Sequence, residues 1–234
     1  MNNLTSREKK ISWFLILPLY FFIGQFIIIY LFVAVLNIFD LKMTINSLNA
    51  LYNLVFCSVF SILTIIVLKK FIKKSFMAFK GNWKKDLFWA STTGIVTLYV
   101  IQYAIGLLFF LFMPESTSAN QDVIVEMMQT DIIPIFITTV ILAPVLEELI
   151  FRGIIFNSLY QKNRIFAHFF SSFLFGFMHI YSALFNGEIG QLLYLIPYGV
   201  MGLVFSFVYE KKGNIIVPIY LHLLNNLISI LLTM

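Results

Sequence analysis

The segment Ala143-Pro144-Val145-Leu146-Glu147-Glu148-Leu149-Ile150-Phe151-Arg152 places two adjacent carboxylates and an arginine inside a long apolar run. An ionisable side chain at the centre of a bilayer costs about 2.5–3.5 kcal/mol on insertion scales, so such residues mark a functional site or a paired structural element. On a helix, Glu148 and Arg152 lie four residues apart on one face, in the order that favours an ion pair. Glu147 is turned about 100° away from that face. The segment therefore predicts a Glu148–Arg152 pair and leaves Glu147 without a local partner.

The composition of the chain is that of a membrane protein. Of its 234 residues, 60% are hydrophobic and only 12% are charged, and the mean hydropathy is +0.92. This length accommodates about seven spans of about 20 residues each. The single cysteine, Cys57, leaves neither a disulfide framework nor a thiolate metal site. The sequence therefore predicts an all-α, polytopic transmembrane helical bundle of about seven spans.

Long apolar runs locate the expected spans, and the charged connections orient them. The runs cover approximately residues 11–38, 50–68, 87–113, 132–156, 165–184, 189–209 and 214–234. With a cytoplasmic N-terminus, fifteen of the sixteen Lys and Arg residues fall on the cytoplasmic side, and Lys42 is the exception. This asymmetry predicts that the N-terminus is cytoplasmic, and it explains the net charge of +5 without nucleic acid as a partner.

Two connections between the runs have opposite charge. Residues 69–85 carry seven lysines, which predicts an amphipathic helix on the cytoplasmic membrane surface, in contact with anionic lipids. The connection after the third run carries acidic residues but neither Lys nor Arg, and we interpret it as a loop on the outside. Its acidic residues are Glu115, Asp122, Glu126 and Asp131.

The last four runs hold further polar side chains. His179 follows Gly176, a residue that allows another backbone or a substrate to approach closely. His222 and Asn226 are four residues apart and share one face of the last helix. Asn225, beside them, is interpreted as a packing residue or a supporting hydrogen-bond donor.

Prolines stand just ahead of two of these polar segments. Pro144 precedes Glu147 by three residues, and Pro218 precedes His222 by four. A proline inside a helix leaves the carbonyl one turn earlier without its hydrogen bond. Such carbonyls are tolerated at bilayer depth where they line a protein interior or a wet cavity. We therefore expect a polar cavity among the last four spans.

The side chains suit hydrolysis of an amide bond. A carboxylate and an imidazole can hold and deprotonate a water molecule, and an imidazole with an amide can donate hydrogen bonds to a developing oxyanion. Taken singly, His179 is equally well explained as an interhelical hydrogen-bonding residue, and His222 with Asn226 as polar contacts between helices. Their joint occurrence with Glu147 favours catalysis. His168, near the basic end of its span, is interpreted as an interfacial residue without a catalytic role.

The polar residues form three motifs. In chain order these are Glu147-Glu148-x-x-x-Arg152, Phe175-x-x-x-His179 and His222-x-x-x-Asn226. On successive late spans they resemble the motifs of the CPBP intramembrane proteases, the group that includes the CAAX-processing type II prenyl endopeptidase and bacterial Abi proteins. The resemblance covers roughly residues 130–230. It implies one integrated membrane domain in two parts: N-terminal transmembrane helices with a basic cytoplasmic loop in residues 1–130, and a CPBP/Abi-like catalytic helical core in residues 131–234.

The resemblance also implies a role for each motif residue. By it, the catalytic residues are Glu147, His179, His222 and Asn226, and the structural supports are Glu148 and Arg152. Glu147 is then the general base, His179 its partner in activating water, and His222 with Asn226 the oxyanion site. The resemblance favours a glutamate protease without a cofactor. Zinc held by Glu147, His179 and His222 is the alternative, although the sequence lacks His-Glu-x-x-His.

The sequence supports two functional hypotheses of different classes. The first is an intramembrane endopeptidase that hydrolyses a peptide bond of a membrane-associated peptide or protein near the cytoplasmic half of the bilayer. The second is a non-proteolytic membrane binding or regulatory protein, such as a bacteriocin-immunity factor, whose polar site holds a ligand. A small transporter is disfavoured because the sequence has no inverted repeat. The many Ile, Lys, Asn and Phe residues indicate a bacterial plasma membrane, which argues against prenylated substrates.

Overall fold

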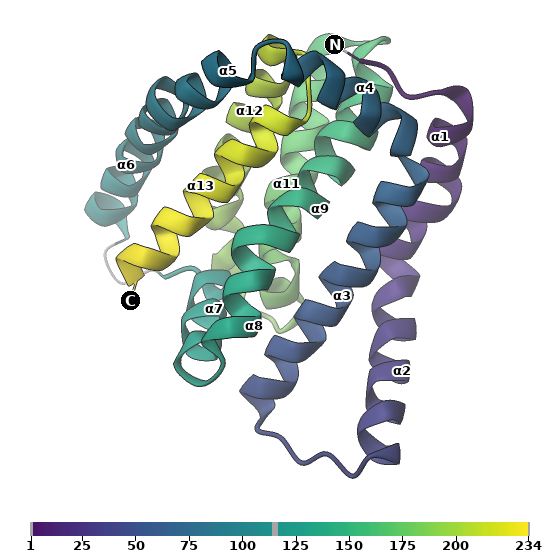
Figure 1. Ribbon diagram of the computed structural model, residues 1–234. Coiled ribbons are helices and arrows are strands. Elements are labelled where there is room, and N and C mark those ends of the chain that lie inside the picture. Colours follow the sequence, from purple (N-terminus) through teal and green to yellow (C-terminus); the bar gives the residue numbers. More distant parts are fainter. Residues whose placement is uncertain (1, 114–116, 234) are drawn as a thin grey trace.

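The computed structural model describes residues 2–113 and 117–233, and every element in these ranges is a helix (Figure 1). Seven helical segments in this part of the chain are long and apolar enough to cross a membrane. They are Ser6–Ile38, Ile45–Val67, Trp83–Phe112, Ile132–Tyr160, Arg164–Phe185, Ile189–Lys212 and Ile216–Thr233. The predicted all-α bundle of seven spans is confirmed, whereas the cytoplasmic N-terminus stays a prediction. Glu115 lies outside the described residues.

Several spans combine α-helices with π-helical turns, in which a carbonyl pairs with the N–H five residues later. The first span contains α1 (Ser6–Ile11), η1 (Ser12–Ile16), η2 (Leu19–Ile23) and α2 (Gly24–Ile38), and the second is α3 (Ile45–Val67). The third contains α5 (Trp83–Trp89), η3 (Ala90–Gly94) and α6 (Ile95–Phe112). The fourth contains α8 (Ile132–Phe136), η4 (Ile137–Leu142), α9 (Ala143–Glu148), η5 (Leu149–Phe156) and α10 (Asn157–Tyr160). The last three spans are α11 (Arg164–Phe185), the 3-10 helix η6 (Ile189–Tyr194) with α12 (Leu195–Lys212), and α13 (Ile216–Thr233).

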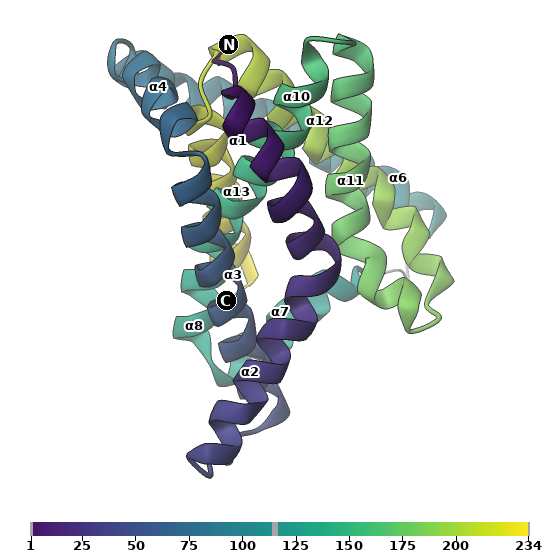
Figure 2. The same cartoon turned by 90° about the vertical axis from the view of Figure 1, so that its right-hand side faces the viewer.

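The fourth span is the centre of the bundle. All eight residues of η5 are buried. Helices α11 and α12 pack against η5, and α3 packs against η4, α8 and α9 of the same span. Figure 2 shows α1 and α2 together with α3 on the side of the bundle that faces the viewer. A Cβ atom on Gly176 of α11 would lie 2.9 Å from the backbone nitrogen of Gly199 on α12, so a larger side chain does not fit between these helices. The close backbone approach predicted at Gly176 is therefore confirmed.

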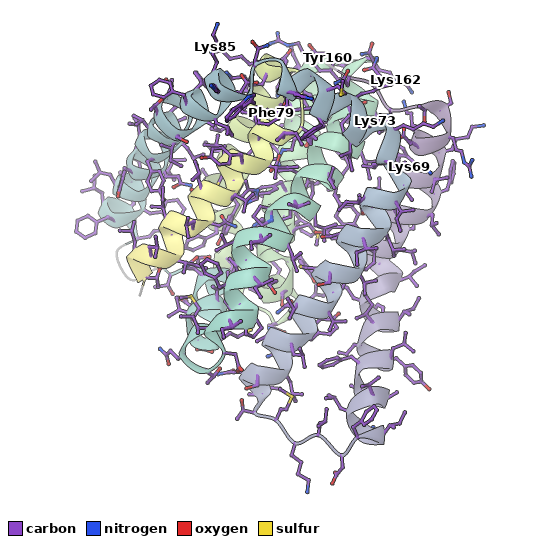
Figure 3. The ribbon with its side chains drawn as sticks, viewed as in Figure 1. Lys69, Lys73, Phe79, Lys85, Tyr160 and Lys162 are labelled. Carbon is purple, nitrogen blue, oxygen red and sulfur yellow. The ribbon has the colours of Figure 1, made fainter. Side chains whose placement is uncertain are left out.

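The lysine-rich connection forms α4 (Lys69–Lys80), which crosses one end of the bundle. Phe71 is buried against the core while the lysines of α4 are exposed, so the predicted amphipathic helix is confirmed. Glu8 of α1 caps α4, because the backbone N–H of Phe71 donates to its Oε1 atom at 2.9 Å. A carboxylate at this position satisfies a free N–H group and complements the helix dipole. Figure 3 labels four lysines at this end of the bundle: Lys69, Lys73, Lys85 and Lys162.

One helix in the acidic connection was not predicted. This connection contains α7 (Ala119–Thr130), whose N-terminus is capped by the side chain of Ser118. Met127 of α7 packs against Ala50 of α3 and Ile135 of α8. Since Met127 is the one buried residue among the twelve of this described helix, α7 lacks the apolar run by which the spans were located. The connection between the third and fourth spans therefore contains a helix that the sequence did not indicate, and its place on the outside stays a prediction.

Candidate active site

The Glu148–Arg152 pair predicted from helical spacing is present and fully buried. Arg152 Nη1 lies 2.9 Å from Glu148 Oε1, and both side chains are 0% exposed. Arg152 Nη2 donates to the carbonyl of Gly202 on α12 at 2.8 Å, and the guanidinium lies over the ring of Phe175, 4.5 Å from its centroid. The pair therefore ties the fourth span to α11 and α12 as well as stabilising its own helix.

Glu148 also holds His222, a contact that the sequence did not indicate. His222 Nδ1 lies 3.1 Å from Glu148 Oε1, and the imidazole stacks on Phe205 with 4.5 Å between ring centroids. An ionised carboxylate only accepts hydrogen bonds, so this contact requires the proton on Nδ1 of His222. In the neutral ring, Nε2 is then the nitrogen with a free lone pair.

His179 is fixed in an equivalent tautomer by a different acceptor. Its Nδ1 atom lies 2.8 Å from the carbonyl oxygen of Phe175, one turn earlier on α11. A carbonyl accepts only, so Nδ1 again carries the proton and Nε2 has the free lone pair. The ring stacks on Tyr198 of α12 with 4.4 Å between centroids and 22° between planes. The phenol of Tyr198 is bound in turn by Ser118 Oγ at 2.7 Å, at the start of α7.

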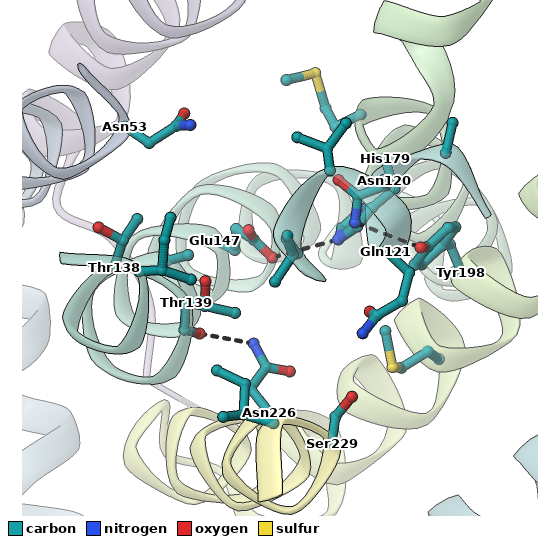
Figure 4. A pocket seen from close by; sticks show the side chains of 18 of the residues that line it. Asn53, Asn120, Gln121, Thr138, Thr139, Glu147, His179, Tyr198, Asn226 and Ser229 are labelled. Carbon is teal, nitrogen blue, oxygen red and sulfur yellow. Dashed lines mark hydrogen bonds and ion pairs between the residues drawn. The ribbon is translucent and has the colours of Figure 1, made fainter. Parts of the chain in front are cut away.

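Glu147 approaches the Nε2 atoms of both histidines, and Figure 4 shows it beside His179. Its Oε2 atom is 4.0 Å from His179 Nε2 and 3.9 Å from His222 Nε2. Within the described part of the chain, this buried oxygen has no hydrogen-bond partner. Three helices, α9, α11 and α13, thus bring together one carboxylate and two imidazoles that the sequence separates by 32 and 43 residues.

Asn226 joins the same site through a carbonyl that Pro144 releases. The N–H of Ala143 bonds to Thr138 O in the π-helical turn η4, so the next bond in the series would join Thr139 O to residue 144, which has no N–H. Asn226 Nδ2 donates to Thr139 O instead, at 2.9 Å. One amide hydrogen of Asn226 is thereby used, and the other stays free for a ligand.

The corresponding expectation for Pro218 is wrong. The last helix begins at Ile216, so Pro218 lies in its first turn, where the missing N–H leaves no helical carbonyl unpaired. Asn214 accepts from the N–H of Val217 at 3.2 Å and caps this helix start. The cavity-facing carbonyl therefore comes from the fourth span alone.

A cavity of about 690 Å³ opens onto this group. It is lined by Glu147, His179, His222 and Asn226 together with residues of α3, α6, α7, α12 and α13. The polar cavity expected from the prolines and charges is confirmed. Asn225, which we expected in a supporting place, donates to Asn226 Oδ1 at 3.1 Å. The catalytic roles of these residues stay predictions.

The three side chains suggested as zinc ligands are not arranged as a metal site. Among the described residues, no group of three His, Cys, Asp or Glu side chains is placed to hold a metal ion. Ligands of one tetrahedral zinc, at about 2.0–2.1 Å from the ion, lie about 3.3 Å apart, whereas the Glu147–histidine separations are 3.9 and 4.0 Å. We therefore derive no step that passes through a metal.

The part of the chain that holds this site is similar to known membrane proteases. Residues 129–228 match the family profile described as type II CAAX prenyl endopeptidase Rce1-like. The chain is 32% identical over 151 residues to the putative membrane peptidase YdiL of Bacillus subtilis, which is 62% of this chain and 57% of that protein. It is 35% identical over 102 residues to the membrane-embedded CAAX protease MroQ of Staphylococcus aureus, 40% of this chain and 37% of that protein. These similarities support the resemblance to the CPBP family that the motifs predicted.

The seven helices long and apolar enough to cross a membrane, together with the bacterial membrane peptidases among the similar proteins, support a multi-pass bacterial membrane protein that resembles membrane proteases. All three motifs lie within the matched residues 129–228. A further relative, the UPF0177 protein YvdC of Lactococcus lactis, is 27% identical over 173 residues, 74% of this chain and 63% of that protein. The chain thus spans about 57–63% of the length of these first relatives. No solved structure matches the chain.

Proposed function

We propose that this protein is an intramembrane endopeptidase in which Glu147 activates a water molecule for attack on a peptide bond. The observation that carries the proposal is the convergence of two imidazole Nε2 atoms on Glu147 Oε2, at 4.0 and 3.9 Å. Two polar atoms that share one water lie about 4–5 Å apart at hydrogen-bond lengths of about 2.8 Å. A water between Glu147 and either histidine donates one hydrogen to the carboxylate and the other to the imidazole.

The reaction then needs only groups already at the site. The water oxygen attacks the carbonyl carbon of the substrate while Glu147 takes up its proton, and the carbonyl oxygen becomes an oxyanion. The free amide hydrogen of Asn226 donates to this oxyanion, and His222 does so when its Nε2 is protonated. As the carbon–nitrogen bond breaks, Glu147 returns the proton to the leaving amine.

The contacts that orient the two histidines support this division of roles. His222 is oriented by Glu148, which is itself anchored by Arg152, in the way that a buried acid orients a catalytic imidazole. His179 is held by a backbone carbonyl and by stacking on Tyr198. Preorganised side chains of this kind lower the reorganisation that the reaction requires.

The natural surroundings of the enzyme are part of the proposal. Its substrate is a membrane-associated peptide or protein, and the exposed lysines of α4 contact anionic lipid headgroups on the cytoplasmic side. A ligand-binding or immunity protein without turnover, built on the same site, is the competing hypothesis. That hypothesis requires a ligand that fills the same cavity, but it does not require Glu147 to accept a proton.

Cleavage of a quenched-fluorescence peptide library by the purified protein in nanodiscs tests the proposal. Wild type, Glu147→Ala and Glu148→Gln are compared with and without a zinc chelator, and Glu210→Gln is the matched control, since Glu210 lies outside the cavity. We expect cleavage that survives chelation, disappears in Glu147→Ala and persists in Glu210→Gln. Folded wild type that cleaves nothing supports the binding hypothesis, and activity that persists in Glu147→Ala overturns the mechanism.

A further inference from the structure

The cavity opens at the end of the bundle opposite the lysine-rich α4. Its lining includes three exposed residues of connections and helix ends: Asn186, Glu188 and Thr233. The first residues of α7 also line it, and α7 lies away from α4 in Figure 1. The mouth of the cavity therefore lies between α7, the α11–η6 connection and the end of α13.

Apart from the two histidines of the site, the charged side chains among the described lining residues are acidic. The carboxylates are Glu147, deep in the cavity, and Glu188, at the mouth, and neither Lys nor Arg is among the described lining residues. Within the described ranges, no ion pair involves Glu188. A cleft lined by one sign of charge between low-dielectric walls concentrates ligands of the opposite sign.

The rest of the lining is suited to a peptide backbone. It presents amide and hydroxyl side chains that both donate and accept hydrogen bonds, among them Gln102, Asn120, Gln121 and Ser229. Such side chains can pair with both the N–H and the C=O groups of an extended peptide.

We propose that the cavity selects a cationic peptide segment, and that Glu188 is the residue at the mouth that recognises its Lys or Arg side chain. This inference rests on the proposed function, because it names the substrate class of the same site. An acidic residue in the segment would face Glu147 and Glu188 together across a cavity whose described lining has neither Lys nor Arg, so acidic peptides bind less tightly. The amide-rich wall holds the peptide backbone, and Glu188 supplies the charge discrimination.

The test measures binding and cleavage side by side. Three peptides that differ at one position, with Lys, Gln or Glu, are titrated onto the full-length protein in nanodiscs of neutral lipid, and the Kd is read from fluorescence anisotropy. We expect the Lys peptide to bind about tenfold more tightly than the Glu peptide, with a difference that shrinks at high salt. Glu188→Gln should lose most of this preference, and Glu188→Lys should reverse it.

The control is Asp40→Asn, which removes one negative charge from an exposed residue that does not line the cavity. Asp40 has a φ of 47°, a conformation that Asn also tolerates, so this variant should keep the full charge preference. Equal affinities for the three peptides, or a preference that Glu188→Lys leaves unchanged, would overturn the inference. Cleavage without charge preference contradicts this inference alone, whereas charge-selective binding without cleavage by folded wild type contradicts the proposed function alone.

Discussion

Among the described residues, histidine side chains contact glutamate side chains at two places, and the hydrogen bonding of the two places differs. The central cluster comprises Glu147, Glu148, Arg152, His179 and His222 on the cavity. The end cluster comprises Tyr160, Arg164, His168, Ser206 and Glu210, where α11 and α12 reach the lysine-rich end of the bundle. In the central cluster the contacts of Glu147 to both histidines are 3.9 Å or longer, whereas in the end cluster the contacts are 2.6–3.0 Å.

The side chains of the end cluster are joined by a network of short hydrogen bonds. Glu210 receives hydrogen bonds from Tyr160, from two nitrogens of Arg164 and from His168. His168 Nδ1 lies 2.7 Å from Ser206 Oγ, and its Nε2 lies 2.9 Å from Glu210 Oε2. Ser206 Oγ also lies 2.8 Å from Leu203 O. His168 therefore joins α11 to α12 through both of its ring nitrogens.

Whether the polar atoms are already hydrogen-bonded distinguishes a structural cluster from a candidate catalytic one better than residue type does. Serine, histidine and glutamate in the end cluster resemble a catalytic triad, yet Ser206 is 0% exposed and its hydroxyl is committed to a carbonyl. The central cluster instead keeps a carboxylate oxygen and two imidazole nitrogens free, facing a cavity. General base catalysis requires a proton acceptor that is not already hydrogen-bonded and that can reach the attacking water.

Arg152→Ala should have the largest effect, because it breaks the foundation of the central cluster. It leaves Glu148 buried with an uncompensated charge and the carbonyl of Gly202 without its donor. We expect a loss of about 3–5 kcal/mol in the free energy of unfolding and no measurable cleavage. Denaturant unfolding in detergent micelles measures the first quantity and the peptide assay the second.

A double variant, Glu148→Met with Arg152→Met, controls for the buried charge. It removes both charges together, so most of the stability should return, whereas activity should stay absent because His222 has lost its orienting carboxylate. If Arg152→Ala unfolds like the wild type, the pair does not support the site in the way proposed.

Glu147→Gln should affect activity alone. The amide cannot accept the proton of the attacking water, and loss of a general base reduces the rate by about 10²–10⁴-fold. No ion pair shorter than 3.9 Å joins Glu147 to another described residue, so the melting temperature should not fall. A melting temperature that falls together with the rate would show that Glu147 is a structural residue like Glu210.

The spans and the local pair were predictable from the sequence because both depend on neighbours along the chain. Hydropathy located the seven spans, and the spacing of four residues gave the Glu148–Arg152 pair. The short helix α7 was not predicted because it has a capping serine and one buried methionine but no apolar run.

The contacts that complete the site were not predictable, because they join helices far apart in the sequence. His222 binds Glu148 across 74 positions, and no local spacing distinguishes that contact from one with Glu147. Pro144 predicted a carbonyl without its helical hydrogen bond. It did not predict that this carbonyl belongs to Thr139 or that Asn226 donates a hydrogen bond to it. Tyr198 belongs to none of the motifs, although it stacks on His179.

Glu210→Gln should have the opposite effect to Glu147→Gln. It weakens the charge-assisted hydrogen bonds that join α11 to α12, which we expect to lower the free energy of unfolding by about 1–2 kcal/mol. The cavity is not lined by Glu210, so kcat/KM at a temperature where the variant is folded should equal that of wild type. A large fall in kcat/KM of the folded variant would mean that the end cluster contributes to catalysis after all.

The smallest effect is expected at Tyr198, which connects the central cluster to α7. Tyr198→Phe keeps the stack on His179 and loses the contacts of the hydroxyl with Ser118 and Asn120, so kcat should change by less than about threefold. Tyr198→Leu removes the stack, worth about 0.5–1.5 kcal/mol, and should reduce kcat by about 2–10-fold because His179 becomes less ordered.

Tyr198→Trp tests whether the ring orients His179 or only packs against α7, since another aromatic ring can stack on the imidazole again. The kcat of this variant should recover relative to Tyr198→Leu, while the melting temperatures of the two variants stay similar. If Leu and Trp differ in stability but not in kcat, Tyr198 serves only to dock α7, and the orientation of His179 depends on its bond to the carbonyl of Phe175 alone.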